Sequence, residues 1–445
     1  MLTTNQLNQD VALRFTMETD GGDEPEHTVE RTTAMRAMSF VAFFAVVIAV
    51  LGGLHYYIWA RLVRDTHVPQ PWAGVMLAGL IVLATGLPLM RLVIRRWPAA
   101  ARIFSWPFYT WLGVAMLLFF LLLGGDILRL VLFVGHKLRA QPLPVDLGRR
   151  TLFARGVAGV VTIVAGVLTA AALRSALGPV AVKRVPVTLS RLPKEMNGFT
   201  LVQLTDIHVG PTIGRAFIET IVAHANALNP DLIAITGDLV DGTVEELRDS
   251  VAPLAQLRAR HGVYFVTGNH EYFSHATPWI AELTRLGIRC LRNERVSIGD
   301  GADSFELAGV DDRSGARSGE PGHGEDLDKA LAALDPAREV VLLAHQPKSV
   351  FAAASHGVGL QISGHTHGGQ IWPFSYLVRL QQPFVAGLHR HEGAQVYVSR
   401  GTGYWGPPMR LGAPAEITQL VLTRGDQGVA QVGGDDGGGS ASRPT

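Results

Sequence analysis

Two kinds of hydrophobic pattern divide this chain near residue 175. Before that point, long apolar stretches follow one another with few charged residues between them. After it, short runs of Val, Ile, Leu and Phe alternate with stretches in which apolar residues recur every three or four positions. The first pattern predicts helices that cross a bilayer, and the second predicts alternating strands and helices. We therefore expect a membrane region followed by an α/β domain with a largely buried sheet.

Four apolar stretches in the first part each approach the roughly 20 residues that a helix needs to cross a bilayer. Tyr and Trp residues lie near their ends, where aromatic rings favour the membrane interface. We expect residues 35–175 to form an all-α region of four transmembrane helices. The stretches are Met38 to Ala60, Trp72 to about Ile94, Phe108 to about Val134 and Leu152 to about Leu173.

Two charges, Asp126 and Arg129, interrupt the third stretch. They can form an ion pair one turn apart on a long helix, or the span can end near Gly125 and continue along the membrane surface. A proton relay is the third interpretation, because charges within a membrane span are costly and often functional.

The sequence gives little information about the orientation of the protein in the membrane. An even number of spans places both termini on one side, and positive charges flank both faces, so the positive-inside rule barely discriminates. The pair Arg149-Arg150 resembles a twin-arginine export signal, which would place the large domain outside the cytoplasm. A basic anchor at a helix end explains the same pair equally well. We expect a multi-pass protein of a bacterial inner membrane, with the domain favoured outside the cytoplasm.

Polar tails flank the two predicted regions. Residues 1–34 and 425–445 carry too little apolar surface to fold alone, and we expect both to be disordered. An extended connector is expected over 176–195 and the α/β domain over 196–424. Its expected helices are Ala216 to Leu228, Val244 to Arg260, Pro278 to Leu286 and Glu325 to Leu334.

Composition narrows the function classes. Apolar residues make up 48% of the chain and charged residues 17%, which fits membrane content. The formal net charge of +1 gives no basic excess, so we expect no nucleic acid polymer as partner. A single cysteine, Cys290, excludes an internal disulfide framework and cysteine-rich metal sites.

Side chains able to bind metals stand at the ends of five apolar runs in the second part. Their donors are oxygen and imidazole nitrogen without any thiolate, a set that suits two divalent ions such as Mn, Fe, Zn or Co. Asp238 is the expected bridge, because one carboxylate that reaches both ions would hold them about 3.5–4 Å apart. The expected metal ligands are Asp206, His208, Asp238, Asn269, His345, His365 and His367.

The order of these motifs resembles the calcineurin-like metallophosphoesterases over about residues 196–424. Finer features lie at Ala344-His345-Gln346-Pro347, Gly364 through Gln370 and Ser399-Arg400-Gly401-Thr402-Gly403. They resemble the membrane-associated bacterial branch with YkuE- and YaeI-like enzymes, which includes hydrolases of UDP-2,3-diacylglucosamine in lipid A synthesis. The motifs are Asp-x-His at 206 and 208, Gly-Asp at 237 and 238, Gly-Asn-His-Glu at 268–271, a lone His at 345 and Gly-His-Thr-His at 364–367.

The resemblance implies a four-layer αββα sandwich with the site at one edge of its sheets. It also implies the division of ligands: one ion held by Asp206, His208 and His367, the other by Asn269, His345 and His365, with Asp238 shared. A metal-bridging hydroxide would attack phosphorus. His270 would be the catalytic residue, stabilising the developing charge or protonating the leaving oxygen.

Four further polar residues near the motifs keep open roles. Asp241 and Glu271 are expected to support the ligands rather than bind metal. Arg400 and Arg410 could meet a substrate phosphate, and a structural salt bridge accounts for them equally well.

The expected function is a membrane-anchored dinuclear-metal phosphoesterase acting on a phosphodiester or pyrophosphate bond. Its partners would be membrane lipids and a phosphate-ester substrate, lipid- or nucleotide-linked, such as UDP-2,3-diacylglucosamine. That substrate would require the domain in the cytoplasm, against the twin-arginine interpretation. A membrane sensor or scaffold with a non-hydrolytic phosphoesterase fold is the alternative, and a transporter is a third class that the scarcity of charges within the spans disfavours.

Overall fold

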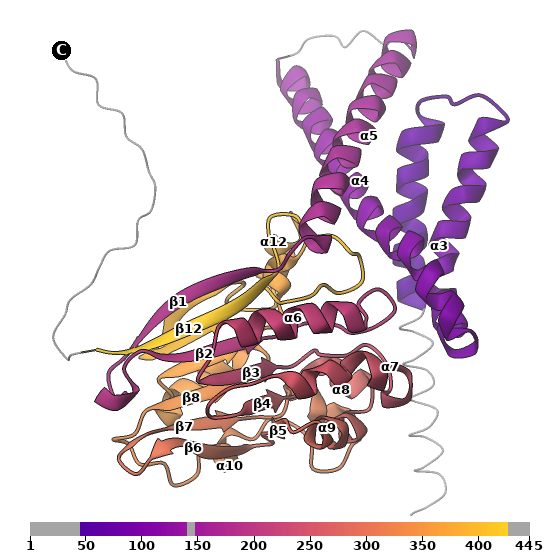
Figure 1. The fold of residues 1–445 in the computed structure, drawn as a ribbon. Coiled ribbons are helices and arrows are strands. Elements are labelled where there is room, and N and C mark those ends of the chain that lie inside the picture. Colours follow the sequence, from indigo (N-terminus) through magenta and orange to yellow (C-terminus); the bar gives the residue numbers. More distant parts are fainter. Residues whose placement is uncertain (1–44, 140–146, 426–445) are drawn as a thin grey trace, which may run out of the picture.

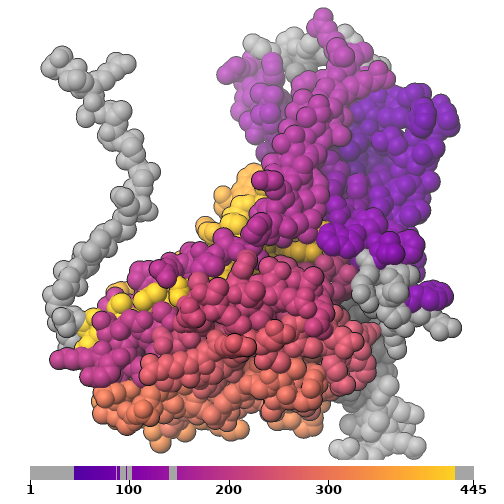
Figure 2. Space-filling model, in the orientation of Figure 1, coloured from indigo at the N-terminus to yellow at the C-terminus, as the bar shows by residue number. Residues whose placement is uncertain are grey.

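The computed structural model describes residues 45–139 and 147–425. The tail expected over 1–34, the start of the first expected span and all but the first residue of the tail expected over 425–445 lie outside these residues. Within them, a group of long helices projects from one side of a domain of two sheets and shorter helices (Figures 1 and 2).

The long helices fall where the apolar stretches predict them. Within the described residues, three helices are long and apolar enough to cross a membrane: Ala45–Arg64, Ile103–Leu138 and Gly148–Leu177. The second expected span lies in α3, whose apolar part Trp72–Gly86 is shorter than these three, so four crossings stay a prediction. The elements are the helix Ala45–Arg64, which ends in a π-helical turn η1 (Ala60–Arg64), then α3 (Trp72–Arg96), α4 (Pro98–Leu138) and α5 (Leu147–Leu177).

The charged pair in the third stretch lies inside α4, which continues unbroken past it to Leu138. Asp126 accepts a hydrogen bond from Arg129 at 3.3 Å and a second from the Tyr57 hydroxyl at 2.7 Å, and its carboxylate lies 2.9 Å from Arg61. Two of these partners belong to the first helix. The geometry thus favours the structural interpretation, in which the charges neutralise one another and tie two helices together.

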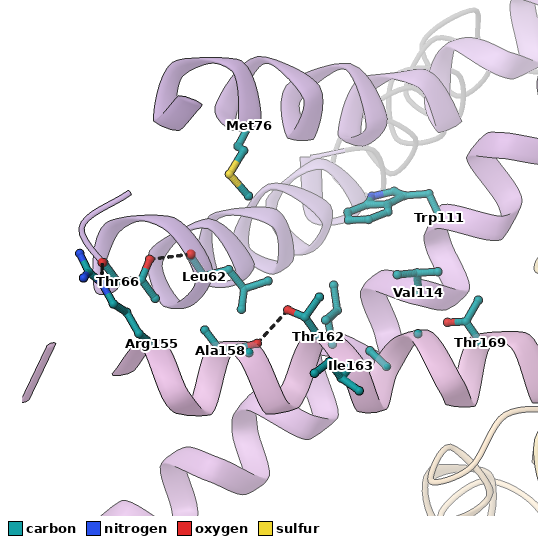
Figure 3. Close-up of a pocket in the computed structure, with 14 residues that line it drawn as sticks. Leu62, Thr66, Met76, Trp111, Val114, Arg155, Ala158, Thr162, Ile163 and Thr169 are labelled. Atoms are coloured by element: carbon teal, nitrogen blue, oxygen red, sulfur yellow. Dashed lines mark hydrogen bonds between the residues drawn. The ribbon is translucent and has the colours of Figure 1, made fainter. Parts of the chain in front are cut away.

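A hollow of about 780 Å³ opens between the membrane helices (Figure 3). Its lining is mainly apolar and includes Leu62, Met76, Trp111 and Ile163, with Arg155 at one end donating from Nε to the Thr66 carbonyl at 2.9 Å. Such a surface suits contact with hydrocarbon and offers few of the polar groups that phosphate binding needs. The catalytic site is therefore to be sought in the domain.

Two six-stranded sheets form the centre of the domain. Their strand orders are β1-β12-β2-β3-β4-β5 and β10-β11-β9-β8-β7-β6. The strands are β1 (Ala181–Leu189), β2 (Phe199–Leu204), β3 (Leu232–Thr236), β4 (Val263–Val266), β5 (Arg289–Cys290), β6 (Glu294–Asp300), β7 (Asp303–Gly309), β8 (Val340–Leu343), β9 (Leu360–Ser363), β10 (Gly387–His391), β11 (Ala394–Val398) and β12 (Glu416–Arg424).

The direction of the strands decides where the loops gather. Strands β2, β3, β4 and β5 are mutually parallel, as are β7, β8, β9 and β11. The carboxyl ends of each set therefore meet at one edge of its sheet. The stretch expected as a connector contributes β1, which pairs in parallel with β12 from Ala181 to Leu189.

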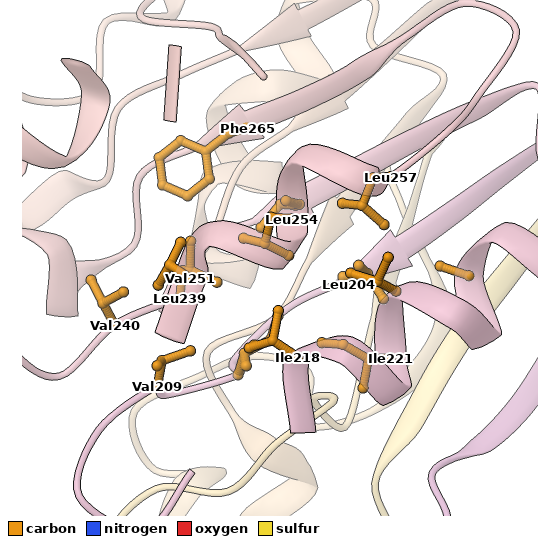
Figure 4. Close-up of a cluster of buried hydrophobic side chains, with 14 of the residues drawn as sticks. Leu204, Val209, Ile218, Ile221, Leu239, Val240, Val251, Leu254, Leu257 and Phe265 are labelled. Carbon is orange, nitrogen blue, oxygen red and sulfur yellow. The ribbon is translucent and has the colours of Figure 1, made fainter. Parts of the chain in front are cut away.

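Three apolar clusters define four layers. One lies between the sheets and contains Leu201 and Leu343. A second fills the space between the first sheet and its outer helices, with Ile218 and Phe265 among its members (Figure 4). A third, around Leu342, covers the outer face of the second sheet. The expected αββα sandwich preceded by a helical membrane region is confirmed.

Seven short helices complete the domain, and two are shorter than the sequence predicts. α7 ends at Val251 and continues as a 3₁₀ helix (Ala252–Gln256), because Pro253 has no N–H for an α-helical bond. The stretch from Glu325 gives only one turn. The helices are α6 (Arg215–Ala227), α7 (Val244–Val251), α8 (Asn269–Phe273), α9 (Ala276–Arg285), α10 (Leu327–Ala330), α11 (Val350–Ala353) and α12 (Ser375–Val378).

Candidate metal centre

The residues expected as ligands come from both sheets and meet where the parallel strands end. The first sheet supplies Asp206 and His208 after β2, Asp238 after β3, and Asn269 with His270 at the start of α8 after β4. The second sheet supplies His345 after β8, and His365 with His367 after β9. All eight lie in one connected cluster, whose contacts form three groups.

The first group joins Asp206, His208 and His367, all buried. The Nε2 atoms of the two imidazoles lie 3.0 Å apart, and the His367 Nε2 is 3.4 Å from the Asp206 carboxylate. Two nitrogen atoms and one carboxylate oxygen that converge in this way are suited to binding a divalent ion.

The second group joins Asp238, His345 and His365. The Asp238 carboxylate lies 3.1 Å from the His345 Nε2 and 3.9 Å from the His208 Nε2, so it reaches toward both groups. The His365 Nδ1 is 2.9 Å from the Asn269 side-chain oxygen. Asp238 therefore occupies the position between the groups that a bridging ligand requires.

A third group adds Asp241, which the sequence placed only in a supporting role. Its carboxylate accepts hydrogen bonds at 3.0 Å from the His208 Nδ1 and at 2.6 Å from the His270 Nδ1. The signal in the sequence is the run Gly237-Asp238-Leu239-Val240-Asp241, in which the second carboxylate follows the first by three residues. Asp241 orients one expected ligand and the expected catalytic histidine together.

Backbone strain is concentrated in the same place. Asp206, His208, Asp238, His365 and His367 all have positive φ, between 51° and 71°. Residues other than glycine rarely adopt this backbone conformation. Where they do, the surrounding contacts must hold them there.

Two buried charged groups supply such contacts. The Glu271 carboxylate accepts hydrogen bonds from the backbone N–H groups of Gly268, Asp238 and Leu239, at 2.6, 3.0 and 2.8 Å. Arg410 donates from Nε to the Gly403 carbonyl at 2.8 Å, and its Nη2 lies 3.3 Å from the His367 Nδ1.

Of the two expected roles of Arg410, the salt bridge does not form with any described residue, and contact with a substrate phosphate stays a prediction. Its guanidinium is 1% exposed and bonds backbone carbonyls and an imidazole instead of a carboxylate. Arg410 fixes the loop around His367, and no sequence signal distinguishes it from Arg400, because the contact depends on tertiary packing.

Burial and neighbouring charges shift the pKa values of two histidines in the site in opposite directions. Burial opposes the charge on His270, yet Asp238 and Asp241 raise its pKa to about 9. Burial, together with the neighbouring positive charge of His345, lowers the pKa of His365 to about 4. The lowered pKa favours neutral His365, which is the form of imidazole that binds metals. The raised pKa favours protonated His270, which is the form that can donate a proton.

Two exposed aromatic residues border the site. The Trp405 ring centroid lies 5.5 Å from that of His270 and 6.5 Å from that of His208, and Phe273 lies 5.3 Å from His270. Trp405 is 55% exposed and Phe273 66%. The opening of the site is thus apolar at its rim.

Similar proteins combine the same two regions. Residues 199–369 match the family described as calcineurin-like phosphoesterase. A Bos taurus protein described as "Transmembrane protein with metallophosphoesterase domain" is 40% identical over 402 residues, which cover 86% of this chain and 88% of that protein. A Danio rerio protein with the same description is 36% identical over 407 residues, 87% of this chain and 90% of that protein.

A bacterial relative aligns over a shorter part. The uncharacterized metallophosphoesterase YkuE of Bacillus subtilis is 31% identical over 242 residues, 52% of this chain and 82% of that protein. The Bos taurus and Danio rerio alignments cover too much of this chain to be confined to the domain, so they include membrane helices as well. They support a membrane protein with a metallophosphoesterase domain.

Proposed function

Because the chain belongs to the calcineurin-like phosphoesterase family, we propose that it is a membrane-anchored hydrolase that uses two divalent metal ions to cut a phosphodiester or pyrophosphate bond. The observation that carries the proposal is the convergence of seven oxygen and nitrogen donors from the ends of both sheets, with Asp238 within 4 Å of a histidine from each group.

The residues present fit two such ions. Asp206, His208 and His367 would hold one, and Asn269, His345 and His365 would hold the other, with Asp238 shared. Oxygen and imidazole donors without thiolate suit Mn, Fe, Zn or Co. When bound, the pair of ions would supply an acidified water as the nucleophile and neutralise charge on the phosphate.

His270 is the proposed catalytic residue. Its Nδ1 donates to Asp241 at 2.6 Å, which fixes the ring, and its backbone N–H donates to the Asp238 carboxylate at 2.9 Å. The two carboxylates favour the imidazolium form. A proton held in this way can stabilise the charge that develops on phosphate oxygens or pass to the leaving oxygen.

Substrate and orientation are proposals of their own. A lipid- or nucleotide-linked ester such as UDP-2,3-diacylglucosamine would suit a protein anchored in a bacterial inner membrane, but it requires a cytoplasmic domain. The basic pair Arg149-Arg150 supports the opposite orientation. A reporter enzyme fused to the carboxyl end decides between them, and an extracytoplasmic reporter would eliminate that substrate.

The test of the proposed function uses the purified full chain in detergent with added Mn²⁺. We expect hydrolysis of a generic phosphodiester that stops when the metal is chelated. His270→Ala should lower the rate about 10²–10⁴-fold while metal content stays unchanged. His356→Ala, which changes a histidine that contacts Asp328 outside the site, is the control. Bound metal without hydrolysis of either a diester or a monoester would replace the enzyme by the sensor or scaffold alternative.

A further inference from the structure

A short apolar segment follows the metal centre along the chain. Residues 372–380, which include α12, start five positions after His367 and expose five large apolar side chains to solvent. Leu380 is 81% exposed and Tyr376 60%. Single exposed apolar residues are ordinary, but a contiguous group of this kind marks a surface that another apolar surface covers. The five are Trp372, Phe374, Tyr376, Leu377 and Leu380.

The membrane helices pack beside this segment. Ile371, directly before it, belongs to one apolar cluster with Leu117 of α4 and Ala172 of α5. Figure 1 places α12 next to the end of α5 that leads into β1. The segment therefore lies at the level where α5 leaves its apolar stretch, which is where the surface of a bilayer around these helices would be.

The same segment is joined to the rim of the metal centre. The Trp372 N–H donates to the Leu411 carbonyl at 2.9 Å. The Gln370 side-chain oxygen accepts a hydrogen bond from the backbone N–H of Trp405 at 2.9 Å, and the Gln370 side-chain nitrogen donates to the Trp405 carbonyl at 2.9 Å. Trp405 in turn borders His270. The loop that carries the exposed segment is thus hydrogen-bonded to the loop that borders the opening of the site.

The composition of the segment favours a membrane surface as its occupant. Trp, Tyr, Phe and Leu side chains together with Arg379, whose guanidinium lies 5.9 Å from the Tyr376 ring, are typical of helices that lie in a membrane surface. A basic side chain at this level also favours anionic headgroups. A bilayer around α4 and α5 would be continuous with this surface, so no additional protein is needed to cover it.

We propose that residues 372–380 insert into the surface of the bilayer and direct the metal centre toward phosphate esters whose apolar part stays in the membrane. This inference rests on the proposed function and narrows its substrate class to lipid-borne phosphate esters. The headgroup phosphate would enter past Trp405 while the acyl chains remain in the bilayer. Water-soluble esters would reach the same ligands without help from the segment.

The first arm of the test measures insertion and needs no activity. In a Cys290→Ser background, Leu380→Cys carries an environment-sensitive dye in the full chain reconstituted in phosphatidylcholine vesicles. We expect brominated acyl chains to quench this dye. Ser190→Cys is the control, since Ser190 is exposed and lies beyond the nine residues of β1, about 30 Å along the strand from the end of α5. Absence of quenching at position 380 would overturn the proposal, and disulfide formation between unlabelled Leu380→Cys copies would then identify a dimer surface instead.

The second arm compares two diesters with the same leaving group: soluble bis(p-nitrophenyl) phosphate and a phosphatidyl ester of p-nitrophenol in the same vesicles. The double variant Leu377→Ser, Leu380→Ser should lose about tenfold on the lipid ester, because two apolar side chains no longer hold the site at the membrane, and keep its rate on the soluble ester. Phe351→Ser removes an exposed apolar side chain from α11 and should change neither rate.

The two arms separate failure of this inference from failure of the proposed function. Equal losses on both esters, or no loss on the lipid ester, would overturn the membrane role while leaving hydrolysis intact. If the unaltered protein cuts neither ester, the proposed function fails, and the quenching measurement alone decides whether the segment inserts.

Discussion

At the scale of single residues, the site is defined by side chains whose backbone is held in an unfavourable conformation. Asp238 has a φ of 51° and follows Gly237, whose φ is 82°. A Cβ at Gly237 would lie 2.6 Å from the Gly268 backbone nitrogen, so only glycine fits there. The tight packing of these two turns brings the Asp238 carboxylate between the two groups of ligands.

Asp238→Asn is the most direct test of the shared ligand. Asn tolerates positive φ as well as Asp does, so the turn should survive. The loss of one negative charge should weaken binding at both positions, and we expect metal content to fall with a rate at least about a hundredfold lower. Metal analysis and diester hydrolysis measure this outcome. Asp328→Asn, at an exposed carboxylate, is the control, and a fully active Asp238→Asn protein would eliminate the bridging role.

The single cysteine gives a prediction about pH. Burial raises the pKa of the Cys290 thiol to about 11. The thiolate is the reactive form, so alkylation of the folded protein should be slow at pH 8 and accelerate as the pH approaches 11. Iodoacetamide labelling followed by mass spectrometry checks this, with the unfolded chain in urea as the fast reference. Equal rates for both forms at pH 8 would contradict the burial of the thiol.

At the scale of elements, the sequence was most informative where strands end. Periodicity located β2, β3, β4, β8 and β9 together with the polar residues that follow them, because parallel strands deliver their carboxyl ends to one edge. The supporting role of Asp241 was expected, but its partners and those of Arg410 could not be read in this way. Their partners are fixed by packing between distant segments, from 29 residues between Asp241 and His270 to more than 200 between Arg410 and Ala172. Neither residue belongs to a periodic pattern.

The strand β1 is a whole element that the sequence likewise did not reveal. Residues 181–189 contain Pro186 and alternate between exposed and buried positions toward their end, which in isolation fits an extended connector. Their partner β12 lies more than 200 residues later, so pairing along the whole strand has no local signature. Pro186 is tolerated because β1 is at the edge of its sheet.

Glu271 joins the turn after β3 to the turn before α8, and its removal should affect both. Glu271→Ala leaves the buried N–H groups of Gly268, Asp238 and Leu239 without an acceptor, at about 1–3 kcal/mol each. We expect a clearly lower melting temperature and weaker metal binding. Glu271→Gln retains one acceptor oxygen and should lose less. Glu245→Ala, at an exposed position in α7, is the control. Unchanged melting of Glu271→Ala would show that the turns hold without this carboxylate.

At the scale of the whole molecule, the membrane helices touch the wall of the metal centre. The Arg410 backbone N–H donates to the Ala172 carbonyl of α5 at 3.0 Å, while the guanidinium of the same residue contacts His367. Next to it, Met409 is fully buried against α4 and α5. The helices therefore brace the loop that positions a metal ligand, so they do more than tether the domain.

A single glycine of α4 tests this bracing. A Cβ at Gly113 would overlap the sulfur of Met409 and lie 3.1 Å from the Cβ of Pro407, so Gly113→Leu must push the loop away from the helix. Since Arg410 moves with its neighbours, His367 would lose its support, and small displacements of catalytic groups lower rates by about 10- to 100-fold. We expect that loss on the soluble diester. Added Mn²⁺ should restore neither the metal content nor the rate completely.

Two further variants decide the cause of that loss. Gly124→Leu adds the same side chain to the same helix at a position with nothing within 4 Å, and it should leave the rate unchanged. Gly113→Leu combined with Met409→Ala restores space at the contact and should recover much of the activity, because the steric clash, and not the altered helix, displaces the loop. Full activity of Gly113→Leu alone would mean that the metal centre keeps its geometry independently of the membrane helices. Rescue by Met409→Ala would instead establish that contacts with the anchor set the position of His367.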